Sequence, residues 1–199
     1  PILSTIAPRR NLDATLPIIE NDSRAKEILS VSRQGVAENC LIANNTCESS
    51  VVMLRTGSLI GNTIVSNLTR SSETNVALQI YRDVYDHYWG NIYNTILWGN
   101  RNRFANVDFV QTNISIPGIM FNCAVEGDVV NDTTSNNIAL SHDNISSVYS
   151  PHFVNPTTGA GNAYANGDWR LAEGSFCINA ASQGYSTLSV DLSNSPRLQ

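Results

Sequence analysis

The residue types best suited to chemistry lie in one short stretch between Tyr81 and Gly90. It holds two carboxylates, a histidine and three large aromatic rings: Asp83, Tyr85, Asp86, His87, Tyr88 and Trp89. Aromatic faces stack on sugar rings, and neighbouring carboxylates accept hydrogen bonds from sugar hydroxyls. We therefore predict that these six residues bind a ligand and that the ligand is a glycan. The alternative is that the rings fold over the adjoining structure and seal an apolar edge, with their polar tips in water.

A catalytic interpretation of the same stretch depends on Asp83 and Asp86. Glycoside hydrolysis needs two carboxylates about 5 to 9.5 Å apart, and Arg82 and His87 adjoin this pair in the sequence. The elements typical of polygalacturonases are absent from the sequence, as is a Gly-x-Ser-x-Gly nucleophile motif. We predict no catalytic residues, and a polysaccharide lyase or glycoside hydrolase acting on acidic polysaccharide stays the alternative function.

Metal and cofactor sites are not predicted. His87, His142 and His152 share no zinc-ligand spacing, and no Cys-x-x-Cys pair occurs. The acidic residues near Asp128 and Asp143 do not form a calcium-loop pattern. We interpret them as solvated turn residues.

The elements that must position the 81–90 stretch are given by a recurring phrase. Short β-branched runs bounded by Asn, Gly and Ser start at Leu16, Asn39, Asn62, Asn94 and Asn122. The first three starts are 23 residues apart, and later intervals of 32 and 28 residues leave room for insertions. A repeat of this length with such runs is typical of a β-solenoid in which each repeat forms one coil.

A second apolar run follows each phrase, so each coil has two or three strands that pair with their counterparts one coil on. The predicted fold is all-β: a single-stranded, right-handed parallel β-helix of about five coils. Coils occupy residues 1–147, with an insertion near 81–90, and residues 148–199 form an irregular C-terminal capping segment of the same domain. Asn21, Asn44 and Asn67 recur at one phrase position and are predicted to stack as an amide ladder.

Composition limits the choice of partners and compartments. Twelve Lys and Arg against 17 Asp and Glu give a net charge of −5, which does not favour nucleic acid or an anionic membrane. No apolar run is long enough to span a bilayer. Cys40 and Cys123 share a phrase position three coils apart, roughly 14 Å at the usual strand spacing, which is beyond disulfide reach. We predict buried free thiols.

The C-terminal motifs resemble those of a known group. They read Pro151 to Pro156, Gly167 to Leu171, Gly174 to Ala181 and Asp191 to Arg197, together with the Asn-Thr-Ile-Leu-Trp-Gly-Asn phrase from Asn94. These are similar to the right-handed parallel β-helix surface proteins of Bacteroidetes that carry a choice-of-anchor type C-terminal region. Phe176 and Ala181 depart from the Pro and Gly usual in that pattern.

The resemblance implies export and attachment at the outer surface of a bacterium, and it brings no assigned catalytic residues. We therefore expect a secreted or cell-surface module that binds or supports other molecules, as in adhesion or carbohydrate binding. The expected partner is a glycan or a neighbouring surface protein.

Overall fold

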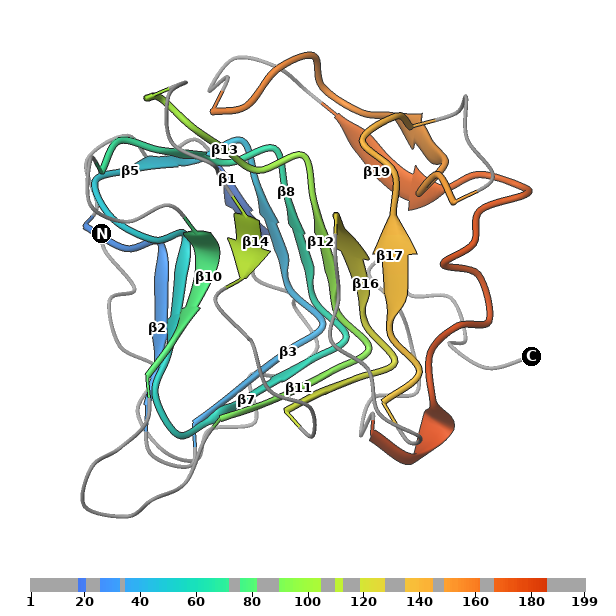
Figure 1. Ribbon diagram of the computed structural model, residues 1–199, viewed down its shortest axis with the longest axis horizontal. Helices are drawn as coiled ribbons and strands as arrows, with labels where there is room; N and C mark the ends of the chain where they lie inside the picture. The colour runs from blue at the N-terminus through green and yellow to red at the C-terminus, as the bar shows by residue number, and fades with distance from the viewer. Residues whose placement is uncertain are drawn as a thin grey trace.

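The computed structural model describes residues 18–20, 26–32, 35–71, 76–81, 90–104, 110–112, 119–127, 135–144, 149–161 and 167–185. Short parallel strands stack in four sheets, which outline the sides of a coil (Figure 1). Every strand pair in these sheets is parallel and joins a strand to its counterpart in the next coil. The described chain is thus all-β, as predicted, and its stacked parallel strands form a parallel β-helix.

The four sheets are numbered here for reference. Sheet 1 contains β1 (Ile18–Glu20), β4 (Leu41–Ala43), β8 (Thr63–Val65), β12 (Ile96–Trp98), β16 (Ala124–Glu126) and β17 (Ile138–Leu140). Sheet 2 contains β2 (Leu29–Val31), β6 (Val52–Leu54), β10 (Val76–Ile80) and β14 (Val110–Thr112). Sheet 3 contains β3 (Val36–Glu38), β7 (Ser58–Ile60), β11 (Asn91–Tyr93) and β15 (Met120–Phe121). Sheet 4 contains β5 (Thr46–Cys47), β9 (Leu68–Thr69) and β13 (Arg101–Asn102).

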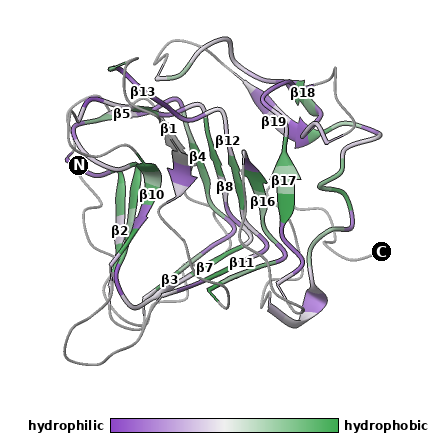
Figure 2. Ribbon diagram, in the orientation of Figure 1, coloured by the Kyte–Doolittle hydropathy of each residue, from purple (hydrophilic) through white to green (hydrophobic). Residues whose placement is uncertain are grey.

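The core fills the inside of the coil. In sheet 1 the middle residues of β4, β8, β12 and β16 point inward, which places Ile42, Ile64, Leu97 and Val125 in one buried column. Figure 2 shows the same division, with strands such as β2, β10 and β12 largely hydrophobic and the corners between strands more polar. Each fully buried aliphatic side chain stabilises the fold by about 1.5 to 3 kcal/mol, so the stack is held mainly by these columns.

Left-handed backbone conformations turn the chain at two corners of successive described coils. Before sheet 1, residues with φ between 49° and 62° align across the coils: Asn39, Gly61, Asn94, Asn122 and Asn136. After sheet 1 a second such column contains Asn44, Ser66, Gly99 and Gly127. Glycine and asparagine adopt this conformation at the lowest cost, which explains why the recurring phrases begin and end on Asn or Gly.

An amide ladder runs inside the second corner, but its members differ by one residue from the prediction. Asn45, not Asn44, aligns with Asn67, because Leu41 pairs with Thr63 and the coil there is 22 residues long instead of 23. The Asn45 Nδ2 donates to Asn67 Oδ1 at 3.0 Å, and the Asn67 Nδ2 donates to Asn100 Oδ1 at 2.8 Å. Asn44 turns outward to accept from Thr157 at 2.8 Å, and Asn21 lies outside the described residues.

The C-terminal segment, residues 149–161 and 167–185, lies along the outside of the coil and is called the clasp here. It contains the antiparallel pair β18 (Phe153–Asn155) and β19 (Asp168–Leu171) and the short 3-10 helix η1 (Gln183–Tyr185). Figure 1 shows β18 and β19 beside the outer face of sheet 1. The predicted capping segment is irregular as expected, and the contacts described for it are with the flanks of several successive coils.

Apolar packing and polar contacts both attach the clasp. Phe153 lies between the rings of Trp98 and Trp169, with centroid distances of 5.7 and 5.2 Å, over an apolar stripe on the outer face of sheet 1. At the first corner, Asn94 exchanges two hydrogen bonds of 2.9 Å with the backbone of Ser182. Beyond this corner the Tyr185 ring stacks on Tyr93 at 4.2 Å.

All four cysteines are free, as predicted. Cys40 and Cys123 do occupy one column of the first corner, separated by Asn62 and Thr95 in the intervening coils. Burial raises the pKa of the Cys40 thiol to about 11 and that of the Cys123 thiol to about 12. Burial also raises the pKa of Cys177, on the clasp, to about 11.

We predict that Asn67→Ala lowers the free energy of unfolding by about 3 kcal/mol, because it leaves the buried backbone amide of Asn45 and the carbonyl of Ile42 without their partner. Chemical denaturation followed by circular dichroism measures this change. Asn155→Ala, at an exposed position of β18, is the matched control and should shift the midpoint by less than about 0.5 kcal/mol. Equal midpoints for the two variants would contradict the ladder's role.

We also predict that the thiols react very slowly with a disulfide reagent such as DTNB at pH 8 in the folded protein. The raised pKa values of Cys40, Cys123 and Cys177 leave little thiolate at that pH, and burial blocks access to Cys40, Cys47 and Cys123. In denaturant all four should react rapidly. Fast release of two or more equivalents from native protein would show that the corner columns are open to solvent.

Candidate functional site

The six predicted ligand-binding residues, Asp83, Tyr85, Asp86, His87, Tyr88 and Trp89, lie outside the described residues. The structure does describe the place from which they emerge. β10 ends at Ile80 and β11 begins at Asn91, and these residues align with Leu54 and Ser58 of the coil before. In that coil, residues 55–57 make the same connection. A ten-residue connection thus leaves and re-enters the coil where the preceding coil needs three residues.

A charged and aromatic pair stands where this connection starts. The Tyr81 side chain follows β10 and is 40% exposed. The guanidinium carbon of Arg55, from the coil before, lies 5.6 Å from the centre of the Tyr81 ring, and Arg55 also contacts the sulfur of Met53 at 3.4 Å. Such a cation–π contact at the surface contributes about 0.5 to 1 kcal/mol. It holds a partly exposed ring and a cation together at the base of residues 82–89.

Glycine fixes the point where the connection rejoins the coil. Gly35, Gly57 and Gly90 form one column, because the residues after them are aligned in β3, β7 and β11. A Cβ at Gly57 would lie 2.4 Å from the Gly35 carbonyl oxygen, and one at Gly90 would lie 2.5 Å from the Leu54 side chain. Successive backbones approach so closely here that only glycine fits. These glycines are visible in the sequence, but they lie outside the recurring phrases and were not predicted to form a column.

Tyr93, at the other flank of the predicted site, belongs to a different environment. Its ring stacks with Phe121, at 5.4 Å, and with Tyr185 of the clasp, at 4.2 Å, and those two rings are 6.0 Å apart, so the three form one cluster. Burial, followed by the proximity of Tyr185, raises the pKa of the Tyr93 phenol. Tyr93 is therefore packed within an aromatic cluster, whereas the flanking Tyr81 is 40% exposed.

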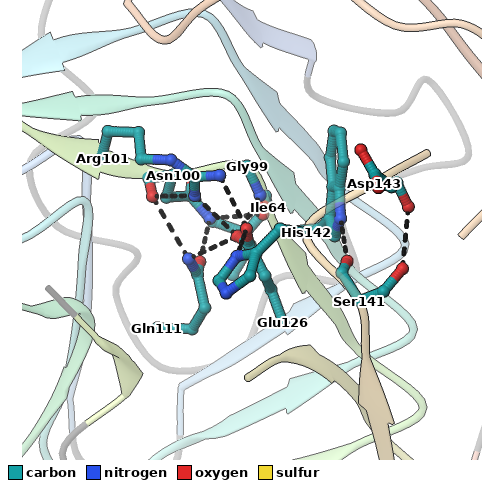
Figure 3. Close-up of polar contacts among 10 residues, drawn as sticks. Ile64, Gly99, Asn100, Arg101, Gln111, Glu126, Ser141, His142 and Asp143 are labelled. Atoms are coloured by element: carbon teal, nitrogen blue, oxygen red, sulfur yellow. Dashed lines mark hydrogen bonds and ion pairs between the residues drawn. The ribbon is translucent and has the colours of Figure 1, made fainter. Parts of the chain in front are cut away.

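Sequence reasoning also missed a buried carboxylate at the end of the amide ladder. Glu126 is the last residue of β16, and its side chain is 1% exposed. Figure 3 shows Arg101, Gln111 and His142 converging on it from three different segments. Two separate oxygens of Glu126 accept the Arg101 guanidinium, at 2.7 and 2.6 Å. This bidentate geometry is the strongest form of such a pair.

Three further donors complete the surroundings of Glu126. The backbone N–H of Gly99 donates to Oε2 at 2.8 Å, and the Gln111 Nε2 donates to the same oxygen at 2.9 Å. The His142 Nδ1 lies 2.5 Å from Oε1. Gln111 in turn accepts from Asn100, the last amide of the ladder, at 2.8 Å. No sequence motif indicates this cluster, because the partners of Glu126 lie 15 to 27 residues from it in the chain.

The hydrogen bonds that Glu126 already accepts limit its possible chemical role. A general base needs a free lone pair within reach of the substrate proton, whereas both carboxylate oxygens here already accept at least two contacts each. A buried charge without partners would be strongly unfavourable, and Arg101 supplies the opposite charge. The arrangement is that of a structural anchor, with the exposed ring of His142 covering its outer side.

Metal binding finds no support among the residues that the structure describes, which contain no group of three His, Cys, Asp or Glu side chains able to hold an ion. Of the histidines, His142 contacts Glu126 and His152 lies on the clasp near Gly174. His87 is among the residues not described.

We predict that Glu126→Gln lowers the free energy of unfolding by about 2 kcal/mol, because it removes the ion pair with the half-exposed Arg101 and sets an amide against the buried Gln111 and Gly99 donors. The matched control is Glu48→Gln. That glutamate is half-exposed and lies 3.7 Å from Arg70, so its loss should cost less than about 1 kcal/mol. Denaturation midpoints of the two variants provide the comparison, and similar values would mean that the buried pair does not anchor the coil.

In the described part of the chain, no helix is long and apolar enough to cross a bilayer. Comparisons with protein-family models, curated proteins and solved structures found no match to this chain.

Proposed function

We propose that the protein is an exported bacterial surface module that uses a parallel β-helix to present a glycan-binding loop, residues 82–89. The observation that carries this proposal is the ten-residue connection between β10 and β11, which replaces the three-residue connection of the preceding coil. Long loops on a regular scaffold are where binding residues concentrate. The composition of this loop, rich in aromatic rings and carboxylates, suits sugar recognition.

The scaffold holds both ends of the loop firmly. Tyr81 donates its backbone N–H to Leu54 at 2.9 Å, and Asn91 donates to Gly57 at 3.1 Å. Because the loop starts and ends on backbone positions fixed by neighbouring coils, little freedom is lost there when a ligand binds. The accessible Tyr81 ring and the Arg55 cation extend the proposed surface from the loop onto the coil.

A binding role is favoured over catalysis by the state of the buried carboxylate. Glu126 is buried, as many catalytic acids are, but its oxygens already accept hydrogen bonds from groups with structural roles. Asp83 and Asp86, on which the lyase or hydrolase alternative depends, lie outside the described residues. No contact among the described residues favours the enzymatic alternative. The surface location rests on the resemblance of the C-terminal motifs alone.

We expect Trp89→Ala and Tyr88→Ala to weaken binding to the preferred glycan about tenfold each, since each removes one stacking ring. A glycan array of neutral and acidic polysaccharides identifies the ligand, and calorimetry then measures the Kd of each variant. Phe104→Ala, which removes an aromatic ring 45% exposed at a different corner, serves as the control and should leave Kd unchanged.

Melting temperatures are compared first, so that a loss of folding is not mistaken for a loss of binding. A blank array for intact protein would refute the proposal, as would Trp89 and Tyr88 variants that bind normally. Release of new reducing ends or unsaturated sugars, abolished in Asp86→Asn, would replace it with the enzymatic alternative.

A further inference from the structure

Two aromatic rings on the clasp remain turned to solvent. Tyr149 is 54% exposed and Phe176 is 39% exposed, and their centroids lie 5.0 Å apart with planes inclined at 55°. The other ring pairs of the described clasp pack inward: Phe153 lies on Trp98, Trp169 lies on Phe153, and Tyr185 lies on Tyr93. The Tyr149–Phe176 pair therefore differs from them in leaving apolar ring surface in water, which is unfavourable unless something covers it.

The backbone on both sides of this pair is tightly held. Next to Tyr149, Ser150 is buried, and its hydroxyl lies 3.3 Å from that of Ser141. The Ser141 backbone N–H donates to the Tyr149 carbonyl at 3.0 Å. Next to Phe176, the Ser175 hydroxyl is buried and donates to the Pro151 carbonyl at 2.5 Å. These bonds fix the two rings on rigid supports, so a ligand meets a surface that is already organised.

The size of the pair limits what can occupy it. Fully burying one large aromatic side chain covers about 150 to 250 Å², so two half-exposed rings offer roughly 200 Å². A stable protein partner needs about 800 Å² on each side. One or two sugar rings match the smaller area. Their C–H faces stack on aromatic surfaces, while their hydroxyls seek acceptors nearby.

Acceptors of the required kind adjoin the rings in the chain. Asp143 is exposed and lies two residues beyond Ser141, and Glu173 is exposed and lies three residues before Phe176. Two exposed carboxylates so near to the rings in the sequence, on a chain of net charge −5, disfavour an acidic sugar but can accept hydrogen bonds from uncharged hydroxyls. The chemistry thus selects a neutral glycan.

From these observations we infer that Tyr149 and Phe176 form a second sugar-binding site, specific for neutral glycans and separate from residues 82–89. This site stands on the described clasp alone and does not depend on the proposed role of the loop. A chain with both sites would hold a polysaccharide at two points, which strengthens attachment without further contacts.

Affinity electrophoresis tests the site with defined probes: galactomannan, β-glucan and xylan as neutral polysaccharides, and polygalacturonate as an acidic one. We expect at least one neutral polysaccharide to retard the intact protein. Tyr149→Ala and Phe176→Ala should each weaken that retardation about tenfold in apparent Kd. Trp89→Ala tests whether the clasp site is independent of residues 82–89. The neutral polysaccharide that binds the clasp should still retard this variant.

The matched control is Val154→Ala, which trims another exposed apolar side chain of the clasp, 49% exposed, without removing a ring. It should bind as the intact protein does. Three results would overturn the inference: no retardation by any neutral probe, normal retardation of both ring variants, or a loss explained by a lower melting temperature. A change in self-association alone, seen by sedimentation in the ring variants, would also overturn it.

Discussion

The polar row inside the second corner imposes the constraint on which the rest of this coil depends. Asn67 accepts a hydrogen bond from Asn45 in the coil before it and donates one to Asn100 in the coil after it. A row of this kind has a direction, so its last donor needs an acceptor that has nothing further to donate. Gln111 accepts a hydrogen bond from Asn100 and donates one to Glu126, so it links the ladder to the carboxylate. An ionised carboxylate accepts only, which is why a buried glutamate, and not another amide, can end the ladder.

Because the ladder ends on a buried charge, that charge needs partners of its own. Arg101 and His142 are these partners. Glu126 lies where the coil shortens, because β16 is followed by β17 only 14 residues on, with Ala124 aligned to Ile138. Arg101 reaches Glu126 from sheet 4 and His142 from the segment after β17. The same segment carries Asn144, whose amide exchanges two hydrogen bonds with the backbone of Phe153 on the clasp. Ladder, shortened coil and clasp are thus connected through a few neighbouring residues.

The sequence predicts the stacked parallel strands well. It predicts poorly the side-chain contacts that join the coil to the clasp and one corner of the coil to another. Recurring β-branched runs correctly indicated the parallel strands, and the shared position of Cys40 and Cys123 correctly indicated free thiols. The register was wrong by one residue at Asn44, because Asn, Ser and Gly are interchangeable at a left-handed corner and so blur the phrase. The pairing of Phe153 with Trp98 and the approach of Arg101 to Glu126 join segments without common spacing. The binding role of residues 82–89 remains a prediction.

A stack of coils has a weakness that the clasp corrects. In a solenoid each repeat contacts its neighbours only, so a terminal coil can unfold without disturbing distant ones. The clasp contacts coils at different levels of the stack: Thr157 bonds to Asn44, Gly161 bonds to Ser66 in the next coil, and Asn122, two coils further on, donates to Ala180. Opening any one of these coils therefore disturbs a segment that the others also hold. We expect this long-range coupling to make the short stack unfold as one cooperative unit, and a cooperative unit keeps surface rings and loops in fixed positions for a ligand.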